Sequence, residues 1–303
     1  MDGWRGDVIA ALESLYPLHL AEGWDNVGLL VDCLDDEEEE EEEEAGEGQK
    51  KKKVVLITND LTERTLDEAL AAGATLVVTY HPRPFGKFKR LVRDDVTQRI
   101  VLRCVRAGVA VWSPHTACDN AAGGVNDWLA SGLADGGSAS IRPVKGIGDR
   151  ARGLAGVGNG RIFELATPIS VGELLAKVKA HLKLPHLRVA PAASLFPGGG
   201  VAGGLEGALA AAATVRTVAV QAGSGHSVLA GCAADAWVTG EASHHEVLAA
   251  NAEGATVILA EHSNTERGFL PTMREALLGA EGVAGKGVTV IVSASDEDPL
   301  RVV

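Results

Sequence analysis

Residues 54–82 read VVLITNDLTERTLDEALAAGATLVVTYHP, and this stretch decides the fold class of the 303-residue chain. Two apolar runs, 54–59 and 74–79, flank a segment with helical spacing that stops at Gly73. Continuous apolar runs of this length are typical of parallel strands that are buried on both faces. The stretch therefore predicts a strand–helix–strand unit, which is the building block of an α/β protein.

A related unit recurs near the other end of the chain. Residues 248–262 align on residues 67–81 with six identities in fifteen positions, four of which involve Ala or Gly. The aligned histidines, His81 and His262, each follow a helix-stopping glycine by eight residues. Apolar runs at 217–220 and 235–239 supply further strands. We expect a duplicated fold.

Both helices of these units carry signals for their starts. Thr65 and Glu68 have the spacing of a capping box in the first unit, and Ser243 and Glu246 have it in the second. Gly223-Ser-Gly225 lies between the apolar runs 217–220 and 235–239 and predicts a tight turn. The alternative is a loop whose backbone amides bind an anion.

A third histidine, His115, follows the apolar run 109–112. Open α/β sheets bind ligands at the carboxyl ends of their strands, and all three histidines are expected there. Asp119 and Glu266 follow closely. One histidine at such an end is usually an inert surface residue, but three with nearby carboxylates favour a ligand site.

Imidazole and carboxylate groups together suit zinc, iron or manganese. His262 and Glu266 are four residues apart and would share one face of a helix. The chain contains neither HExxH nor GxSxG, which excludes the common zincin motif and the usual serine-hydrolase elbow.

Composition sets the remaining bounds. Hydrophobic residues make up 46% and charged residues 23%, as in ordinary globular proteins. The four cysteines are scattered without a CxxC pair, which indicates a reducing compartment. No signal peptide and no apolar run long enough to span a membrane is visible. We expect a soluble protein of the cytoplasm, with the nucleus as a further location.

The formal charge of −13 is unevenly spread. Asp35 to Lys53 hold eleven acids and four lysines, which gives −7 and leaves −6 for the rest of the chain. Such a segment has no apolar surface to bury, so it predicts a disordered insertion, with an acidic interaction tag or a weak binder of cations as the alternative. The absence of a basic stripe or RNA-binding signature argues against direct nucleic-acid binding.

Six blocks, in order and within about residues 5 to 275, resemble the signature of the NGG-one-interacting-factor-three family. Its bacterial members are often labelled GTP cyclohydrolase 1 type 2 homologues. The blocks are AEGWDNVGLLV at 21–31, VTYHP at 78–82, HTACD at 115–119, GGVNDWL at 123–129, VTGE at 238–241 and HSNTERG at 262–268.

The resemblance implies duplicated three-layer α/β/α lobes with mostly parallel sheets, which we place at 1–140 and 141–303 with intertwined packing. It also implies a hexameric toroid, with protein partners a further possibility. By the same resemblance, a dinuclear metal centre lies at the interface between the lobes. His81, Asp119, His262 and Glu266 match its ligands, and Glu266 bridges the two ions.

The chain departs from the family pattern in two places. Tyr80 stands where many bacterial members have a second histidine, and phenol is a poor ligand near neutral pH because its reference pKa is about 10. One or two ions per chain are therefore expected. The acidic insertion falls in a loop that the family keeps short.

Two functions are compatible with these residues and with the resemblance. In one, the protein is a metal-dependent hydrolase of unknown substrate, and His115 or Glu241 transfers protons. The family label would make that substrate a purine nucleotide. In the other, the protein is a metal-binding scaffold or regulatory partner linked to transcription, without catalysis.

Overall fold

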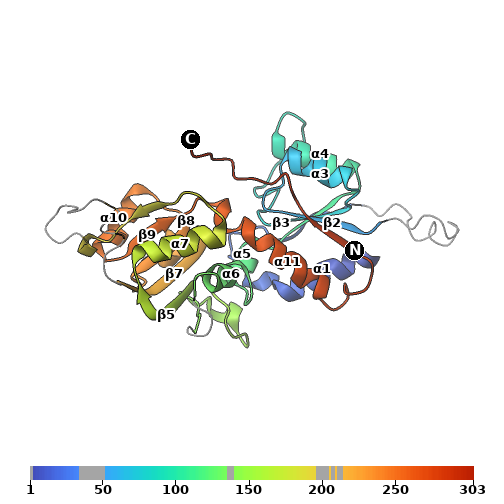
Figure 1. Ribbon diagram of the computed structural model, residues 1–303. Coiled ribbons are helices and arrows are strands. Elements are labelled where there is room, and N and C mark those ends of the chain that lie inside the picture. Colours follow the sequence, from blue (N-terminus) through green and yellow to red (C-terminus); the bar gives the residue numbers. More distant parts are fainter. Residues whose placement is uncertain (1–2, 34–51, 135–139, 196–204, 206–208, 210–213) are drawn as a thin grey trace, which may run out of the picture. The chain divides into compact units, whose positions relative to one another are not determined.

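The computed structural model describes residues 3–33, 52–134, 140–195, 205, 209 and 214–303. Most of the acidic insertion at 35–53 lies outside these residues. The chain forms two compact units, each with one five-stranded sheet (Figure 1). Unit 1 contains residues 1–118 and 270–297, and unit 2 contains residues 119–269 and 298–303.

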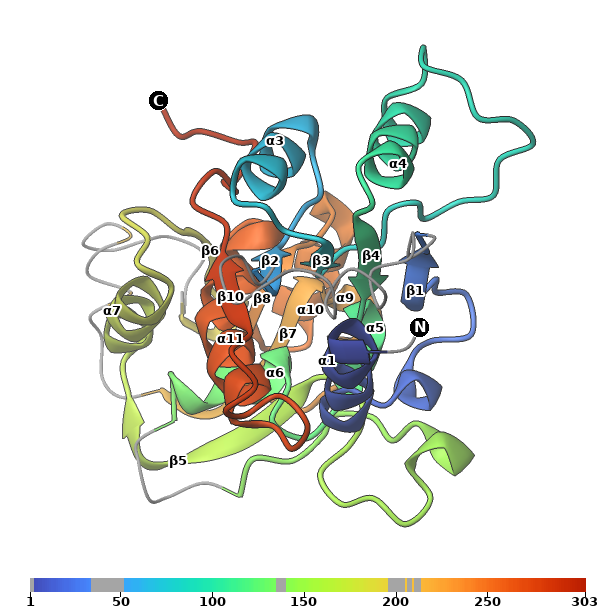
Figure 2. The ribbon, with the colours of Figure 1, turned by 90° about the vertical axis from the view of Figure 1, so that its right-hand side faces the viewer.

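The sheet of unit 1 has the strand order β1-β4-β3-β2-β10. Its strands are β1 (Gly28–Val31), β2 (Val54–Thr58), β3 (Leu76–Thr79), β4 (Ala110–Ser113) and β10 (Thr289–Val292). All neighbours are parallel except β1, which runs antiparallel to β4 at one edge. The strand β10 occupies the other edge beside β2, although it comes last in the chain (Figure 2).

Helices cover both faces of this sheet. They are α1 (Gly3–Leu15), α3 (Glu63–Ala71), α4 (Val96–Arg106) and α11 (Leu270–Gly279), and a 3-10 turn, η1, spans Leu18–Leu20. On one face, Leu66 of α3 and Ile100 of α4 pack with Leu56 and Val77 of the strands in one buried cluster. The first helix start differs from the prediction. The capping box of α3 pairs Thr62 with Thr65, because Thr62 is the last extended residue before the helix.

The sheet of unit 2 has the order β5-β7-β8-β9-β6. Its strands are β5 (Arg161–Ile169), β6 (Arg188–Ala190), β7 (Val215–Ser224), β8 (Ala236–Glu241) and β9 (Thr256–Leu259). The central three are parallel, and both edge strands are antiparallel to their neighbours. The expected mixed α/β fold with mostly parallel sheets is thus confirmed.

The helices of unit 2 are α6 (Val125–Ser131), α7 (Val171–Leu182), α9 (His226–Leu229) and α10 (His244–Ala252). Short 3-10 segments are η2 (Gly148–Ala151), η3 (Ala193–Leu195), η4 (Ser263–Thr265) and η5 (Arg267–Phe269). Leu229 of α9 and Ala250 of α10 pack on Trp237 and Val257 of the sheet. The predicted capping contact is present, since the Ser243 amide donates to Glu246 at 2.7 Å.

Arg161 anchors the helical segment after residue 119 to this sheet. Its guanidinium is buried and donates to Asp127 of α6, with one Nη2–Oδ2 distance of 3.0 Å. The same group donates to the carbonyl oxygens of Ala121, Gly158 and Gly160 at 2.9, 2.7 and 2.8 Å. Asp127 in turn accepts from the amide of Gly123 at 2.7 Å. All of these groups are satisfied, so Arg161 fixes α6 rigidly on β5.

Among the described residues, no helix is both long and apolar enough to cross a membrane.

Candidate metal centre

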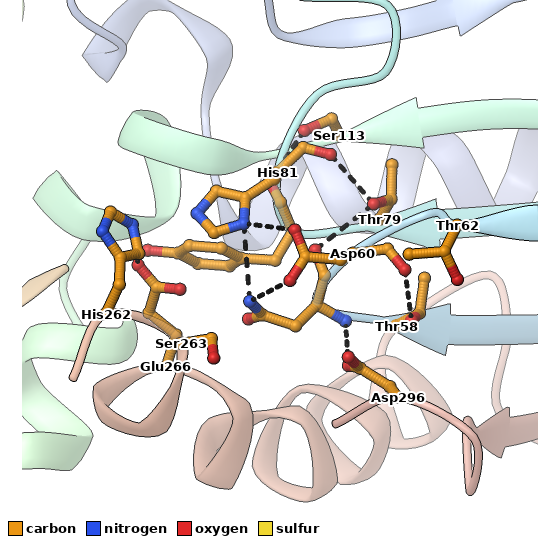
Figure 3. A network of polar contacts seen from close by, with 12 residues as sticks. Thr58, Asp60, Thr62, Thr79, His81, Ser113, His262, Ser263, Glu266 and Asp296 are labelled. Carbon is orange, nitrogen blue, oxygen red and sulfur yellow. Dashed lines mark hydrogen bonds and ion pairs between the residues drawn. The ribbon is translucent and has the colours of Figure 1, made fainter. Parts of the chain in front are cut away.

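His81 lies just beyond the carboxyl end of β3. Its amide donates to the carbonyl oxygen of Asn59 at 3.0 Å, which extends the pairing of β3 with β2 by two residues. The side chain of Asp60 follows β2 and places Oδ1 3.0 Å from Nδ1 of His81 (Figure 3). The ends of two neighbouring strands thus bring an imidazole and a carboxylate together. Asp60 was not predicted from the sequence, although it directly follows the apolar run 54–59.

His115 begins α5 (His115–Asn120), which crosses the division between the units after Cys118. Its φ of 31° is unusual for a residue with a side chain, and such backbone strain persists only where the surroundings impose it. Here Asp25 imposes it. The carboxylate Oδ1 lies 2.7 Å from Nδ1 of His115, and Oδ2 accepts from the amide of Thr116 at 3.1 Å and from the Thr116 hydroxyl.

The Asp25 carboxylate is fully buried. Burial alone would raise its pKa, but hydrogen bonds from His115, Thr116 and Asn26, with the charge of His115, hold the pKa below its ordinary value. A carboxylate that stays ionised beside Nδ1 favours a proton on that nitrogen, so that the lone pair of the neutral ring is on Nε2.

Aromatic rings of unit 1 surround His115. Its ring centroid lies 5.4 Å from that of His81 and 6.0 Å from that of Tyr80. Tyr80 is 2% exposed and also packs edge-on against His81 at 5.3 Å. Trp24 and Phe85 contact His115 from 6.1 and 6.4 Å. The residue in the place of the family's second histidine is therefore a packed part of this cluster.

His262 and Glu266 are adjacent in unit 2. The segment between them is the 3-10 turn η4 rather than an α-helix, yet Nε2 of His262 lies 3.2 Å from Oε1 of Glu266. Thr265 holds the turn, because its hydroxyl donates to the carbonyl oxygen of His262 at 2.7 Å. Nδ1 of His262 lies 3.1 Å from Oε1 of Glu241, the last residue of β8.

Two glycines make room for this pair. Gly223 has φ +65°, and a Cβ there would lie 2.7 Å from Oε1 of Glu266 and 3.0 Å from Nε2 of His262. A Cβ at Gly240 would lie 2.6 Å from the carbonyl oxygen of Gly223 and 2.8 Å from Cα of His262. Glycine near the ends of β7 and β8 thus leaves the space that the imidazole of His262 and the carboxylate of Glu266 occupy.

The predicted tight turn at Gly223-Ser-Gly225 is wrong. β7 continues through Ser224, and Gly225 directly precedes α9. The amide of Gly223 donates to the Thr265 hydroxyl at 2.8 Å, so it is engaged within the protein rather than turned toward an anion.

Asp119 lies on α5, one turn after His115, and is partly buried. Its carbonyl oxygen accepts from Nδ2 of Asn126 at 3.1 Å, and Oδ1 of Asn126 accepts from the Ala222 amide at 2.8 Å. Asp119 is not among the described side chains that could hold a metal ion together. The structure therefore fixes the backbone of Asp119 next to β7 through Asn126.

The three histidines share one feature, which is a carboxylate at Nδ1: Asp60 for His81, Asp25 for His115 and Glu241 for His262. Histidines that bind metals almost always donate their other ring N–H in this way, which fixes the tautomer and increases ligand basicity. Two ligands at about 2.1 Å from one ion lie roughly 3–3.5 Å apart. The 3.2 Å between Nε2 of His262 and Oε1 of Glu266 fits that requirement.

Comparisons with known proteins give a consistent result. The model of the family described as Duf34/NIF3 (NGG1p interacting factor 3) matches residues 5–299. Protein NIF3 homolog of Schizosaccharomyces pombe is 38% identical, covering 95% of this chain and 94% of that protein. NGG1-interacting factor 3 of Saccharomyces cerevisiae is 36% identical, covering 97% and 96%. A crystal structure of a Bacillus cereus protein related to NIF3 aligns with a TM-score of 0.72 at 21% identity, covering 98% of both chains. That likeness concerns the fold.

Proposed function

The chain belongs to the Duf34/NIF3 family, and we propose on that premise that it is a metal-dependent hydrolase. The proposed ligands of its ion are His81, Asp119, His262 and Glu266. His81, His262 and Glu266 form a His/Glu set that could hold a metal ion. The observation that carries the proposal is the contact between Nε2 of His262 and Oε1 of Glu266. Glu241 orients the same imidazole through its other ring nitrogen, Nδ1.

This donor set suits zinc, iron or manganese. When bound, such an ion would lower the pKa of a coordinated water to about 7, which is the chemistry a hydrolase requires. Glu266 supplies negative charge that offsets the cation, and its burial strengthens that attraction because water screens it less. Asp60 and Glu241 keep the Nδ1 protons of their histidines, so that each Nε2 offers a lone pair.

His115 is the proposed proton-transfer group. Asp25 fixes its ring, and the strained backbone at φ 31° holds it beside His81 within unit 1. Of the two candidates for this role, Glu241 is already engaged with Nδ1 of His262. We therefore assign proton transfer to His115 and positioning to Glu241.

The proposal includes a hexameric assembly, which rests on the family resemblance, and action in the cytoplasm, which rests on the scattered cysteines. The resemblance also implies a second ion, whose position is the weaker one because Tyr80 replaces a histidine. The second candidate function is a metal-binding regulatory partner without catalysis. The name of the yeast relative, NGG1-interacting factor 3, favours it, because that name describes a protein interaction.

Glu266→Gln tests the metal site directly. The change keeps the shape of the side chain and removes its charge. Loss of a group that hydrogen-bonds a metal ligand typically lowers metal affinity about 10–100-fold, so loss of a ligand itself should lower it at least as much. We expect a folded protein with sharply reduced metal by elemental analysis and no turnover in a screen of nucleotides and phosphoesters. Glu253→Gln, an exposed acid after α10, is the matched control. Normal metal content in Glu266→Gln would exclude the assignment of Glu266 as a metal ligand. If the fully metal-loaded wild-type protein turns over none of these compounds, the regulatory role is favoured.

A further inference from the structure

Two large rings of unit 1 are exposed beside the candidate proton-transfer group. Trp24 is 64% exposed and Phe85 is 53% exposed. Their centroids lie 6.2 Å apart at an interplanar angle of 62°, and both contact the imidazole of His115. Single exposed apolar residues are common, but two rings grouped against a constrained histidine form a specific surface.

This surface is built rigidly. Nδ2 of Asn26 donates to the carbonyl oxygen of Pro84 at 2.6 Å, which ties the turn carrying Trp24 to the residue before Phe85. The next residue after Trp24 is Asp25, whose carboxylate holds His115. Rings that are already in place lose little conformational freedom when a ligand stacks on them.

The segment that carries Phe85 is positively charged. In Figure 2 it is the extended loop that precedes α4. Residues 83–95 contain five basic and two acidic side chains, a net +3 in a chain of net −13. The basic side chains are Arg83, Lys87, Lys89, Arg90 and Arg93.

None of those five forms an ion pair with the described residues. The next two arginines along the chain behave differently, since Arg99 pairs with Glu63 at 2.7 Å and Arg103 pairs with Asp67. In an acidic protein, five basic side chains without ion pairs on one loop indicate an anionic partner for that loop.

We propose that this surface binds a phosphorylated compound with a planar heteroaromatic ring, of the nucleoside monophosphate class. The ring stacks on Trp24 and Phe85, and the phosphate is held by basic side chains of the adjoining loop, with Lys87 two residues from Phe85. The inference rests on the proposed function, because it supplies the substrate class of that same site. An acidic peptide would use the charge but would have no need of two rings beside His115. Stacking accepts any base, since every base has a π-face, so no particular base is specified.

Binding of three probes tests the assignment. Adenosine monophosphate has ring and phosphate, adenosine has the ring alone, and ribose 5-phosphate has the phosphate alone. We expect calorimetry on the metal-loaded protein to give at least tenfold tighter binding for adenosine monophosphate than for either fragment. Trp24→Ala and Phe85→Ala should each weaken it at least fivefold, and both substitute exposed side chains. Equal binding of adenosine monophosphate and ribose 5-phosphate, or wild-type affinity in both variants, would overturn the proposal.

Charge variants separate the two halves of the ligand. Lys87→Gln should weaken binding of the monophosphate and leave that of adenosine unchanged, whereas Lys179→Gln on α7 should change neither. Tryptophan fluorescence gives a second readout, because Trp112 and Trp237 are buried while Trp24 is exposed. The ligand should quench emission in the wild type and not in Trp24→Ala.

Elemental analysis keeps this proposal distinct from the metal site. Trp24→Ala and Phe85→Ala should retain wild-type metal content. Loaded protein that binds none of the probes would refute the ring-and-phosphate surface and leave the metal assignment intact. Ring-dependent binding by protein that takes up no metal would refute the metal assignment and leave this surface intact.

Discussion

Nδ1 of His262 lies 3.1 Å from Oε1 of Glu241, which ends the central strand β8. This contact fixes the imidazole from the side opposite Glu266. The candidate site thus depends on a residue that need not touch an ion.

The first prediction follows from that contact. Glu241→Ala removes the acceptor for the Nδ1 proton, so the ring of His262 loses its fixed tautomer and orientation. Metal affinity should fall about 10–100-fold, as is usual for groups behind a ligand. Glu241→Gln keeps an amide oxygen as acceptor and should retain most of the affinity. Titration with a competing chelator measures both, and equal affinity of wild type and Glu241→Ala would show that Glu241 has no positioning role.

Tyr80 sets the expected number of ions. Because a phenol is a poor ligand near neutral pH, protein purified without added metal should contain nearer one tight ion per chain than two. Tyr80→His should raise this number. Two full ions in the unmodified protein would mean that another group, such as His115, replaces the missing imidazole. Elemental analysis of both proteins decides between these outcomes.

Glu68 gives a prediction for acid. Its burial would raise the pKa, but hydrogen bonds from Ser293, Ser295 and the Ala294 amide lower it from 4.5 to about 2. A carboxylate with a depressed pKa stabilises the fold at pH above 4.5, and that contribution is lost as the pH falls toward 2. Since the group is partly exposed, we expect Glu68→Gln to cost only about 1 kcal/mol at neutral pH.

The difference between Glu68→Gln and wild type should shrink between pH 4.5 and pH 2, because the wild type loses the same interaction there. Urea unfolding at several pH values measures it, with Asp67→Asn on the same helix as the control. A difference that stays constant across this range would contradict the prediction.

Arg161 gives a prediction for stability. Arg161→Leu leaves the partly buried Asp127 and three carbonyl oxygens without their donor, which should cost about 2–4 kcal/mol of unfolding free energy. The matched control is Arg216→Leu, whose pair with Glu164 is exposed on the same sheet and should be worth at most about 1 kcal/mol. A similar loss in both variants by urea denaturation would show that Arg161 is no special anchor.

Much of the fold could be predicted from local patterns. The runs at 54–59, 74–79 and 109–112 became β2, β3 and β4, because buried parallel strands are continuous apolar segments with clear ends. The late strand β10 could not be assigned, since its partner β2 is more than two hundred residues earlier and local periodicity carries no information about such pairing. The capping box at Ser243 and Glu246 was predicted correctly because Ser243 directly precedes its helix. The predicted pair Thr65 and Glu68 was wrong because the helix begins three residues earlier, after Thr62.

The candidate site could be predicted in part. His81 and His262 could be identified because each follows a strand at the same position of the repeat, and Glu266 because it comes four residues after His262. Asp60 and Glu241 could not be linked to particular histidines, because those contacts join residues about twenty positions apart across neighbouring strands. The role of Gly223 and Gly240 could not be predicted either, because the sequence does not show which side chains pack against a glycine in the fold.

The return of β10 to the first sheet has a consequence for how the protein is made. Unit 1 begins at the amino terminus, but its edge strand and α11 are synthesised only after all of residues 119–269. A nascent chain therefore exposes an incomplete sheet with an unpaired β2 edge while the intervening unit emerges, and such edges are prone to wrong pairing. Chains truncated before residue 289 should therefore stay bound to chaperones, whereas chains that include β10 should be released. Unit 2, whose five strands all lie within residues 161–259, can complete its sheet first.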